Sequence, residues 1–391
     1  MRDTVKFLLK IIMRATLRVF WIFPIKRNKL FFMSTMGKSY SCNPKYIYES
    51  MIADERFSNC EFIWCFRKPR KNILPHNANT RKINKRNVLS FFYHLLTSKV
   101  VIYNCGGFSY APIRKKQFLV ETWHGAGTYK KVNLTVANKS ASSKKGVEMA
   151  SKDIKLFLAT CEFNTEFFIR KGMGYSGEIL NSGFPRNDSL VNNLSSTKRK
   201  VKALLGLKND ERLILYAPTF KGNEHNAQNI RMESELLDVL KLKENLKKKF
   251  HADWVFATRG HQYAGDLLMK GSDMDLSDYP DMQELLLVAD ILVTDYSSSI
   301  WDFALTRKPC FLFVPDLEEY VGKERGFLTP IDFWPALYAR DNNSLTRVIE
   351  EFCEDSYKKK VNAYFEKYGC YEKGNACEMV NNRIFEEIKG S

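Results

Sequence analysis

Short apolar runs alternate with longer amphipathic stretches along most of this 391-residue chain. Apolar runs of four to eight residues predict buried strands, and apolar residues that recur every three or four positions predict helices. The expected strands are Lys29–Thr35, Glu61–Phe66, Val100–Asn104, Phe118–Thr122, Leu156–Thr160, Leu213–Tyr216, Trp254–Thr258, Ile291–Thr294 and Cys310–Val314. The expected helices are Asn43–Asp54, Val88–Thr97, Lys200–Leu205, Glu233–Phe250, Met282–Val288 and Ser298–Leu305. This alternation predicts an α/β protein whose parallel sheets are covered by helices.

The polar segment Asn192–Arg199 divides the alternation into two halves. A chain of this length is too long for one ordinary domain, because single hydrophobic cores stop growing near ~250 residues. We therefore expect two doubly wound, Rossmann-type domains, at residues 29–192 and 193–344, with a ligand cleft between them. Residues 1–28 are expected to form a separate amphipathic, basic helix that associates with a membrane, and the helical tail 345–391 is a candidate to cross back to the first domain.

The N-terminal segment is amphipathic and basic. Its cations recur every four residues and therefore follow one slowly drifting face of a helix. They are Arg2, Lys6, Lys10, Arg14 and Arg18. So many charges would be costly inside hydrocarbon, and no small-residue cleavage site follows, which argues against both a membrane span and a secretory signal. We expect an interfacial helix, with its cations toward anionic headgroups and its aromatic residues Phe20, Trp21 and Phe23 toward acyl chains. The alternative is a helix packed on the first domain.

The chain carries a large excess of positive charge, with 61 Lys and Arg against 44 Asp and Glu, a formal net charge of +17. Such an excess indicates a polyanionic partner, which is an anionic membrane, a phosphorylated substrate or a nucleic acid. The segment Arg67–Arg86 is rich in these cations and is expected to be a basic surface loop. The nine cysteines are scattered without C-x-x-C pairs or metal-ligand spacing. We therefore expect reduced core cysteines in a cytosolic protein, and no metal site.

Ligands of open α/β sheets bind beyond the carboxyl ends of the strands, so chemistry is expected in the loops that follow strands. The first such loop, ETWHGAG, places His124 where the strand Phe118–Thr122 ends and Gly125 directly after it. An imidazole has its pKa near neutrality, which suits His124 as a base for an attacking hydroxyl. Lys130, shortly downstream, is a candidate phosphate ligand. The alternative is a structural histidine bonded inside the domain.

Two further loops follow strands of the second half. Arg259 and His261 flank Gly260 after the strand Trp254–Thr258, and both side chains can donate to phosphate oxygens. After the strand Ile291–Thr294, serine hydroxyls and free backbone amides at the start of a helix can form a phosphate cradle. The candidate binding residues of this loop are Thr294, Asp295, Ser297, Ser298, Ser299 and Asp302. The alternative is simple capping of the helix by Ser297 or Asp295.

The motifs in these loops resemble those of the CDP-glycerol glycerophosphotransferase family, the teichoic acid primases and polymerases with a GT-B-like fold. Five motifs occur in the family's order over about residues 30–320. They are TWHGAG around His124, GFPRND at Gly183–Asp188, YAPTF at Tyr216–Phe220, RGH ending at His261, and TDYSSSIWDFALTRKP from Thr294 to Pro309. Many relatives carry a proline and a lysine close behind the WHG, whereas this chain has Ala126-Gly127-Thr128-Tyr129 before Lys130. This departure leaves the role of Lys130 open.

The resemblance implies that His124 is the catalytic base toward the acceptor hydroxyl, and that His261 and the turn Ser297–Ser299 hold the donor diphosphate. It also implies a basic, amphipathic membrane-facing surface on the first domain and places Ser277–Leu286 near the cytidine. No cofactor is expected, because CDP-glycerol or CDP-ribitol is the donor substrate, and a donor-bound Mg²⁺ is left open. The implied partners are a lipid-linked saccharide or polyol phosphate acceptor and an anionic membrane. The implied location is peripheral, at the cytoplasmic face of the cell membrane.

Our hypothesis is that an acceptor hydroxyl, deprotonated by His124, attacks the β-phosphorus of the CDP-polyol in line and expels CMP, in teichoic acid or capsule synthesis. One alternative is a ribitolphosphotransferase of the same family that uses CDP-ribitol. Another is a GT-B glycosyltransferase that uses a nucleotide sugar. A non-catalytic polyanion-binding module does not need histidine and hydroxyl loops at strand ends, so we expect no nucleic-acid partner.

Overall fold

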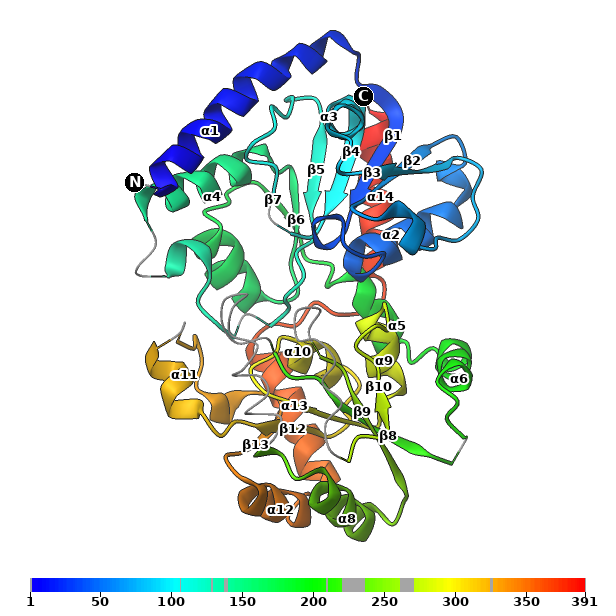
Figure 1. The fold of residues 1–391 in the computed structure, drawn as a ribbon, viewed down its shortest axis with the longest axis vertical. Coiled ribbons are helices and arrows are strands. Elements are labelled where there is room, and N and C mark those ends of the chain that lie inside the picture. The colour runs from blue at the N-terminus through cyan, green and yellow to red at the C-terminus, as the bar shows by residue number, and fades with distance from the viewer. Residues whose placement is uncertain are drawn as a thin grey trace. The chain divides into compact units, whose positions relative to one another are not determined.

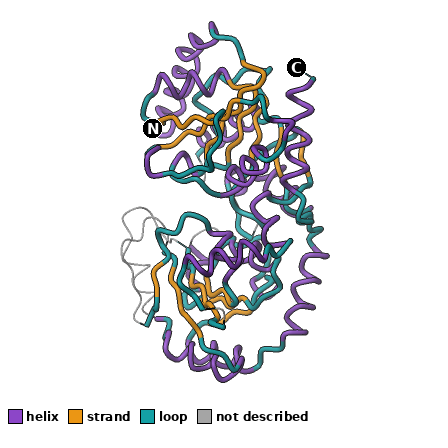
Figure 2. The backbone as a smooth tube through the Cα atoms, turned by 90° about the vertical axis from the view of Figure 1, so that its right-hand side faces the viewer, coloured by secondary structure: helices purple, strands orange, loops and turns teal. Residues whose placement is uncertain are grey.

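The structure is a computed structural model that describes residues 2–105, 107–127, 129–136, 140–208, 210–219, 236–260, 271–323 and 326–390. The chain divides into two compact units, of which unit 1 comprises Met1–Asp188 and Cys370–Ser391, and unit 2 comprises Ser189–Gly369. Each unit is a parallel sheet with helices on both faces (Figures 1 and 2). These two doubly wound units confirm the predicted fold class.

Unit 1 is built on a seven-stranded sheet in the order β3-β2-β1-β4-β5-β6-β7. Its strands are β1 (Lys26–Met33), β2 (Glu61–Phe66), β3 (Thr80–Asn84), β4 (Ser98–Tyr103), β5 (Phe118–Glu121), β6 (Leu156–Leu158) and β7 (Glu178–Leu180). Its longer helices are α1 (Arg2–Thr16), α2 (Cys42–Ile52), α3 (Val88–Thr97), α4 (Ala141–Asp153), the π-helix η6 (Asn164–Gly172) and α14 (Ala376–Lys389). The strand order reverses between β1 and β4, so the topological switch point lies between these two strands.

Unit 2 is built on a six-stranded sheet in the order β10-β9-β8-β11-β12-β13. Its strands are β8 (Arg212–Tyr216), β9 (Trp254–Thr258), β10 (Met274–Asp275), β11 (Ile291–Thr294), β12 (Cys310–Phe313) and β13 (Leu337–Ala339). Its helices include α6 (Ser195–Leu204), α8 (Val239–Phe250), α9 (Met282–Val288), α10 (Ser299–Ala304), α11 (Leu317–Lys323), α12 (Asn342–Glu350) and α13 (Glu354–Lys367). The order reverses between β8 and β11, which defines the switch point of this unit.

The central strands are buried on both faces, as parallel strands covered by helices should be. Residues Val100–Tyr103 of β4 are fully buried and pair with Leu30–Met33 of β1. Each fully buried Val, Leu, Ile or Phe side chain contributes about 1.5–3 kcal/mol relative to an exposed one. The continuous apolar runs therefore position the strand ends on which the candidate loops are carried.

One prediction for unit 1 is wrong in part. The basic segment Arg67–Arg86, expected to be a loop, contains the edge strand β3, which pairs in parallel with β2. Only Ile83 of this strand is buried, while Arg81 and Lys82 are exposed. Charged side chains are common on edge strands, because they prevent pairing with another chain. An edge strand of this kind contains no apolar run and is therefore missed when strands are predicted from apolar runs.

The N-terminal element also differs from its prediction. Residues 1–28 are not one helix, because α1 is followed by the 3-10 helix η1 (Leu17–Ile22) and β1 already begins at Lys26. Helix α1 rests on α4 (Figure 1), where Arg14 Nη1 lies 2.7 Å from Asp153 Oδ2. The prediction that the cations of this helix point toward membrane headgroups is therefore wrong for Arg14, which faces the protein. The outer face of α1 is instead apolar, with Leu8 53% and Ile12 58% exposed.

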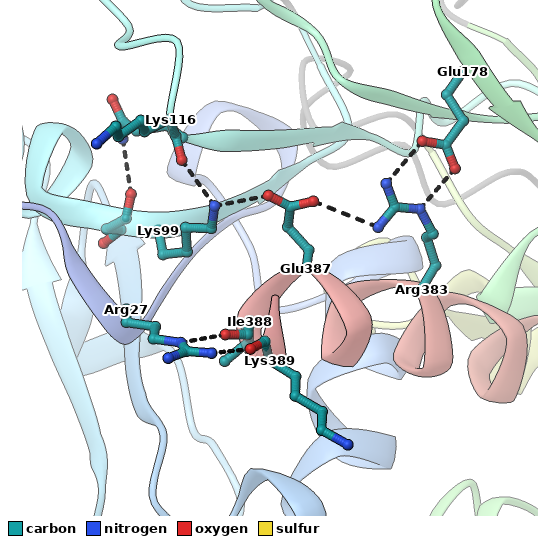
Figure 3. Close-up of polar contacts among 10 residues, drawn as sticks. Arg27, Lys99, Lys116, Glu178, Arg383, Glu387, Ile388 and Lys389 are labelled. Atoms are coloured by element: carbon teal, nitrogen blue, oxygen red, sulfur yellow. Dashed lines mark hydrogen bonds and ion pairs between the residues drawn. The ribbon is translucent and has the colours of Figure 1, made fainter. Parts of the chain in front are cut away.

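The tail predicted at residues 345–391 is divided between the units, because α13 belongs to unit 2 and α14 to unit 1. Helix α14 is attached to the sheet of unit 1 by ion pairs and by backbone acceptors (Figure 3). Lys99 Nζ lies 2.7 Å from Glu387 Oε1, and Arg383 Nε lies 2.7 Å from Glu178 Oε1. The guanidinium of Arg27 donates to carbonyl oxygens at the end of the same helix. The last helix is therefore an integral part of unit 1.

Three further findings concern the chemistry of the chain. All nine cysteines are free thiols, but only four are buried and Cys353 is exposed, so the expectation of core cysteines holds for part of them. Among the described residues, no group of three or more His, Cys, Asp or Glu side chains is arranged to hold a metal ion. No helix within the described ranges combines the length and the hydropathy that crossing a bilayer requires.

Candidate functional site

The histidine loop of unit 1 turns sharply where β5 ends. Trp123 adopts a left-handed backbone conformation with φ 53°, which is uncommon for a residue with a side chain and costs of order 1–3 kcal/mol. The left-handed glycine of the loop is Gly127, with φ 75°, whereas Gly125 shows no positive φ. Strained turns of this kind persist only where neighbouring groups hold them in place.

Two buried side chains from distant segments hold this turn. Asn43, at the start of α2 and fully buried, donates from Nδ2 to the carbonyl oxygens of Thr122 (3.1 Å) and Trp123 (3.0 Å). Arg186, within the GFPRND motif, donates from Nη1 to the carbonyl oxygen of His124 at 2.8 Å and from its backbone amide to Asn43 Oδ1 at 3.2 Å. The three segments therefore form one hydrogen-bonded unit around the histidine.

The imidazole of His124 is held in one orientation. Its Nδ1 lies 2.8 Å from the carbonyl oxygen of Asn104, just beyond β4. A carbonyl oxygen can only accept, so Nδ1 carries the proton and Nε2 carries a free lone pair. Asn104 is itself bonded, since its Oδ1 accepts from the backbone amide of Thr35 at 2.8 Å, beyond the end of β1. The histidine therefore lies at the carboxyl edge of the sheet, beside the switch point between β1 and β4.

The environment of His124 also favours the neutral form. Although the residue is exposed at the surface, the pKa of its imidazole is lowered, first because the surrounding protein desolvates the ring. The bond to Asn104 opposes this effect, and the positive charge of Arg186 adds to it. A neutral imidazole with a free Nε2 is the form that can accept a proton from a hydroxyl. The Trp123 ring packs against the imidazole, with 4.5 Å between the ring centroids.

In unit 2, the motif TDYSSS lies at the corresponding edge of its sheet. The carboxylate of Asp295 accepts from the backbone amide of Thr219 at 2.9 and 3.0 Å and from the Thr219 hydroxyl at 2.8 Å. Thr219 belongs to the YAPTF motif, which follows β8, whereas Asp295 follows β11. Asp295 therefore joins the two strand ends that flank the switch point of unit 2, where ligands of this fold class bind.

The helix that follows the serine turn is shorter than predicted, and two serine hydroxyls of the turn bond to each other. Helix α10 begins at Ser299 and has six residues, so its dipole is weaker than that of the longer helix expected at Ser298–Leu305. The hydroxyl of Ser299 lies 2.9 Å from that of Ser297, which also accepts from the Ser299 amide at 3.3 Å. The Ser298 side chain caps no helix amide. Capping thus accounts for only part of this hydroxyl cluster.

Arg259 lies at the end of β9, next to β8. Its Nη2 donates to the carbonyl oxygen of Tyr279 at 3.0 Å, and the amide of Gly260 donates to the hydroxyl of Ser277 at 3.0 Å. Ser277 and Tyr279 belong to the segment Ser277–Leu286 that the resemblance places near the cytidine. His261, the second predicted catalytic residue, lies outside the described residues.

Three of the predicted binding residues are buried or partly buried. Thr294 is fully buried, and its hydroxyl donates to the carbonyl oxygen of Ala217 at 2.6 Å. Asp302 is buried on α10, where its Oδ2 accepts from Gln283 Nε2 at 2.9 Å. Lys130 is partly buried in the segment that follows the histidine loop. Both Thr294 and Asp302 already have hydrogen-bond partners inside unit 2, so the function proposed below assigns neither of them a substrate contact.

Several residues of the site were not among the predicted ones. Arg186 and Thr219 lie in the GFPRND and YAPTF motifs, so a role for each motif could have been sought from the sequence. Asn43 and Asn104 carry no such signal, because one is an ordinary residue at a helix start and the other contributes a backbone carbonyl. Only the folded sheet brings these groups to the histidine.

A comparison with protein families agrees with this geometry. The model of the family described as CDP-Glycerol:Poly(glycerophosphate) glycerophosphotransferase matches residues 15–386 of the chain. The chain belongs to this family. It is therefore a member of a family of glycerophosphate-transferring enzymes, as the motifs indicated.

Individual relatives of this glycerophosphotransferase family member are teichoic acid enzymes. The chain is 27% identical over 385 residues to a teichoic acid poly(glycerol phosphate) polymerase of Bacillus spizizenii, covering 95% of each protein. It is 28% identical over 384 residues to a polymerase of the same description from Staphylococcus epidermidis, covering 93% of this chain but 51% of that protein. It thus spans about half the length of the latter. A teichoic acid ribitol-phosphate primase of Bacillus spizizenii is 27% identical over 380 residues.

Solved structures show the same fold. A structure of the wall teichoic acid polymerase TagF superposes with a TM-score of 0.81 at 26% identity, covering 100% of this chain and 98% of that one. A TagF variant in which a histidine is replaced by asparagine, soaked with CDPG, gives a TM-score of 0.82 at 25% identity with the same coverage. The GT-B-like architecture predicted from the motifs is confirmed by this likeness.

Proposed function

We propose that this glycerophosphotransferase family member transfers glycerol phosphate from CDP-glycerol to an acceptor hydroxyl and releases CMP, in the synthesis of teichoic acid. The observation that carries the proposal is the hydrogen bond between His124 Nδ1 and the Asn104 carbonyl oxygen, because it leaves Nε2 free to accept a proton. The relatives named as poly(glycerol phosphate) polymerases support glycerol phosphate as the transferred unit. The acceptor is a polyol phosphate chain or a lipid-linked saccharide.

In the proposed step, the acceptor oxygen attacks the β-phosphorus of CDP-glycerol while its proton passes to His124 Nε2. The bond between the β-phosphorus and the bridging oxygen breaks, and CMP leaves with the electron pair of that bond. The protein then mostly positions the reactants and stabilises charge, as is usual for phosphoryl transfer. The lowered pKa of His124 keeps the imidazole neutral at neutral pH, so no prior deprotonation is needed.

Donor binding is assigned to unit 2. Arg259 and the Gly260 amide lie beyond β9, and the hydroxyl-rich turn Ser297–Ser299 lies beyond β11, so both are at the edge of the sheet where ligands bind. Arg259 and the serine hydroxyls would meet the charge of the diphosphate. His261 is assigned to the same diphosphate on the strength of its motif. Turnover measured with Mg²⁺ and with EDTA decides whether a metal ion accompanies the donor.

We also propose that unit 1 docks peripherally on the cytoplasmic face of an anionic membrane. Large apolar side chains are exposed together on α1, on η1 and at the start of α3, which is unusual for a surface that faces only water. They are Val5, Leu8, Leu9, Ile11, Ile12, Val19, Trp21, Ile22, Phe23, Val88 and Leu89. An apolar groove of about 570 Å³ lies between η1 and α3, lined by Val19, Phe20, Phe23 and Leu89 among others. Acyl chains fit this face, and Arg18, beside the Trp21 ring, supplies a cation near it.

Incubation with labelled CDP-glycerol, CDP-ribitol and nucleotide sugars tests the proposed reaction, with a poly(glycerol phosphate) primer on a lipid carrier as acceptor. We expect CMP release and chain growth with CDP-glycerol. Preferential turnover of CDP-ribitol would instead place the chain with its ribitol-phosphate relatives. Release of nucleotide only from a nucleotide sugar would overturn the proposal.

A further inference from the structure

A cavity of about 200 Å³ lies behind the histidine turn, and its walls include Lys10, Glu121, Trp123, Gly146 and Met173. These residues come from α1, from the end of β5, from α4 and from the end of η6. The cavity therefore lies next to the strained residue Trp123. Of its walls, Glu121 is the acidic side chain that contacts the turn directly.

Glu121 is almost completely buried, with 1% of its surface exposed. Its Oε1 accepts from the backbone amide of Trp123 at 2.9 Å, two residues further along the chain. The Trp123 ring in turn packs on the imidazole of His124. The carboxyl group of Glu121 therefore contacts, through one backbone amide, Trp123, whose left-handed conformation sets the direction of the His124 imidazole.

We propose that Glu121 is a positioning residue for the transfer reaction: its carboxyl oxygen holds the Trp123 amide and, through it, the turn that presents His124 Nε2 to the acceptor. The inference rests on the function proposed above. The backbone of Trp123 is strained, so the turn relaxes toward an ordinary conformation when the acceptor of its amide is removed. Relaxation moves the imidazole, and a displacement of about 1 Å costs roughly 10²-fold in rate.

The protonation state of Glu121 gives this role a pH signature. Burial raises the pKa of its carboxyl group to about 8, against the opposing bond from Trp123. Tyr103 on β4 and Cys105 just beyond it carry no positive charge in either protonation state, so neither can compensate an ionised Glu121. Burial and the nearby Glu121 raise the pKa of Tyr103 well above its ordinary value and that of Cys105 to about 11. Lys10 is a cation among the residues that line the cavity, and Arg14 is already paired with Asp153.

Above pH 8, the ionised carboxylate of Glu121 would lie in a buried environment, where an unsolvated charge is costly. The cheaper response is for water to enter the cavity and for the turn to open. The activity of the wild-type protein should therefore fall on the alkaline side with a midpoint near the pKa of Glu121. A glutamine at this position keeps the carbonyl acceptor but cannot ionise, so it should abolish that fall.

The experiment compares Glu121→Gln, Glu121→Ala and the control Val101→Ala in the full-length protein. Val101 is a fully buried residue of β4 that pairs with Leu119 on β5, so its truncation tests a loss of core packing without touching the turn. CMP release from CDP-glycerol is measured from pH 6 to pH 10, and thermal unfolding checks that each variant folds. A second readout independent of activity is the ¹⁵N-histidine NMR spectrum, in which His124→Asn identifies the His124 signals.

We expect Glu121→Ala to lower kcat roughly 10- to 100-fold with little change in KM for CDP-glycerol, and to weaken the Nδ1–H tautomer signature of His124. Glu121→Gln should restore most of that kcat and lose the alkaline fall in activity. Val101→Ala should keep both the wild-type kcat and the alkaline fall. Wild-type kcat in Glu121→Ala with an intact tautomer signature, or an unchanged alkaline limb in Glu121→Gln, overturns the positioning role. A wild-type protein that releases no CMP overturns the proposed function instead, and the NMR comparison still decides the role of Glu121.

Discussion

Replacing His124 by asparagine isolates the proton-accepting role of the imidazole from its structural role. The side-chain amide of asparagine reaches about as far as Nδ1 of histidine, so it can still donate to the Asn104 carbonyl oxygen. What the variant lacks is Nε2. General-base assistance is typically worth about 10²- to 10⁴-fold, which corresponds to roughly 3 to 5 kcal/mol of the barrier. We expect kcat to fall by that factor, while the melting temperature stays close to that of the wild type because His124 is exposed.

The pH profile supplies the sharper test. The pKa of His124 is lowered from its ordinary 6.5, so the acid limb of kcat/KM for the wild-type protein should have its midpoint below that value. The residual activity of His124→Asn should lack this limb. The matched control is His251→Asn in unit 2, where the backbone is left-handed with φ 51° and asparagine is readily accommodated. A His124→Asn protein that keeps more than a tenth of the wild-type kcat, or that keeps the acid limb, would refute the assignment of the base.

Three further predictions follow from other contacts. The folded pKa of Glu121, about 8, lies above its ordinary 4.5, so its contribution to stability is complete below pH 4.5 and is lost as pH rises to 8. Denaturant unfolding should therefore show Glu121→Gln more stable than wild type by roughly 3 to 5 kcal/mol at pH 8.5, with little difference at pH 4.5. If the free energy of unfolding depends on pH equally in both proteins, this prediction is wrong. Asp295→Ala leaves the partly buried Thr219 amide without its acceptor, and calorimetric titration should show binding of CDP-glycerol weakened by about 1–3 kcal/mol. Unchanged affinity would remove Asp295 from the donor site. Replacing Leu8 and Ile12 by glutamine should reduce co-sedimentation with phosphatidylglycerol vesicles without changing CMP release from a soluble acceptor, and full retention on vesicles would reject the docking face.

The strands that the apolar pattern located best are those buried on both faces. Glu61–Phe66 and Trp254–Thr258 were predicted with the bounds that the structure gives to β2 and β9. Strands at sheet edges escaped, because β3 has one buried side chain in five and reads as a basic loop. The orientation of α1 could not be read from its period either. Period identifies two faces of a helix, but the pairing of Arg14 with Asp153 on α4 decides which face meets the protein.

The sequence by itself determined the alternation of strands and helices, the existence of two α/β halves, and the loops at strand ends that carry His124, Arg259 and the serine cluster. These features follow from local periodicity and from the rule that parallel strands present their carboxyl ends at one edge. Only the tertiary structure decided which tautomer His124 adopts and which groups hold its turn. Asn43, Asn104 and Arg186 reach the turn from separate segments of the chain, and hydrogen bonds between such segments exist only once the sheet has brought them together.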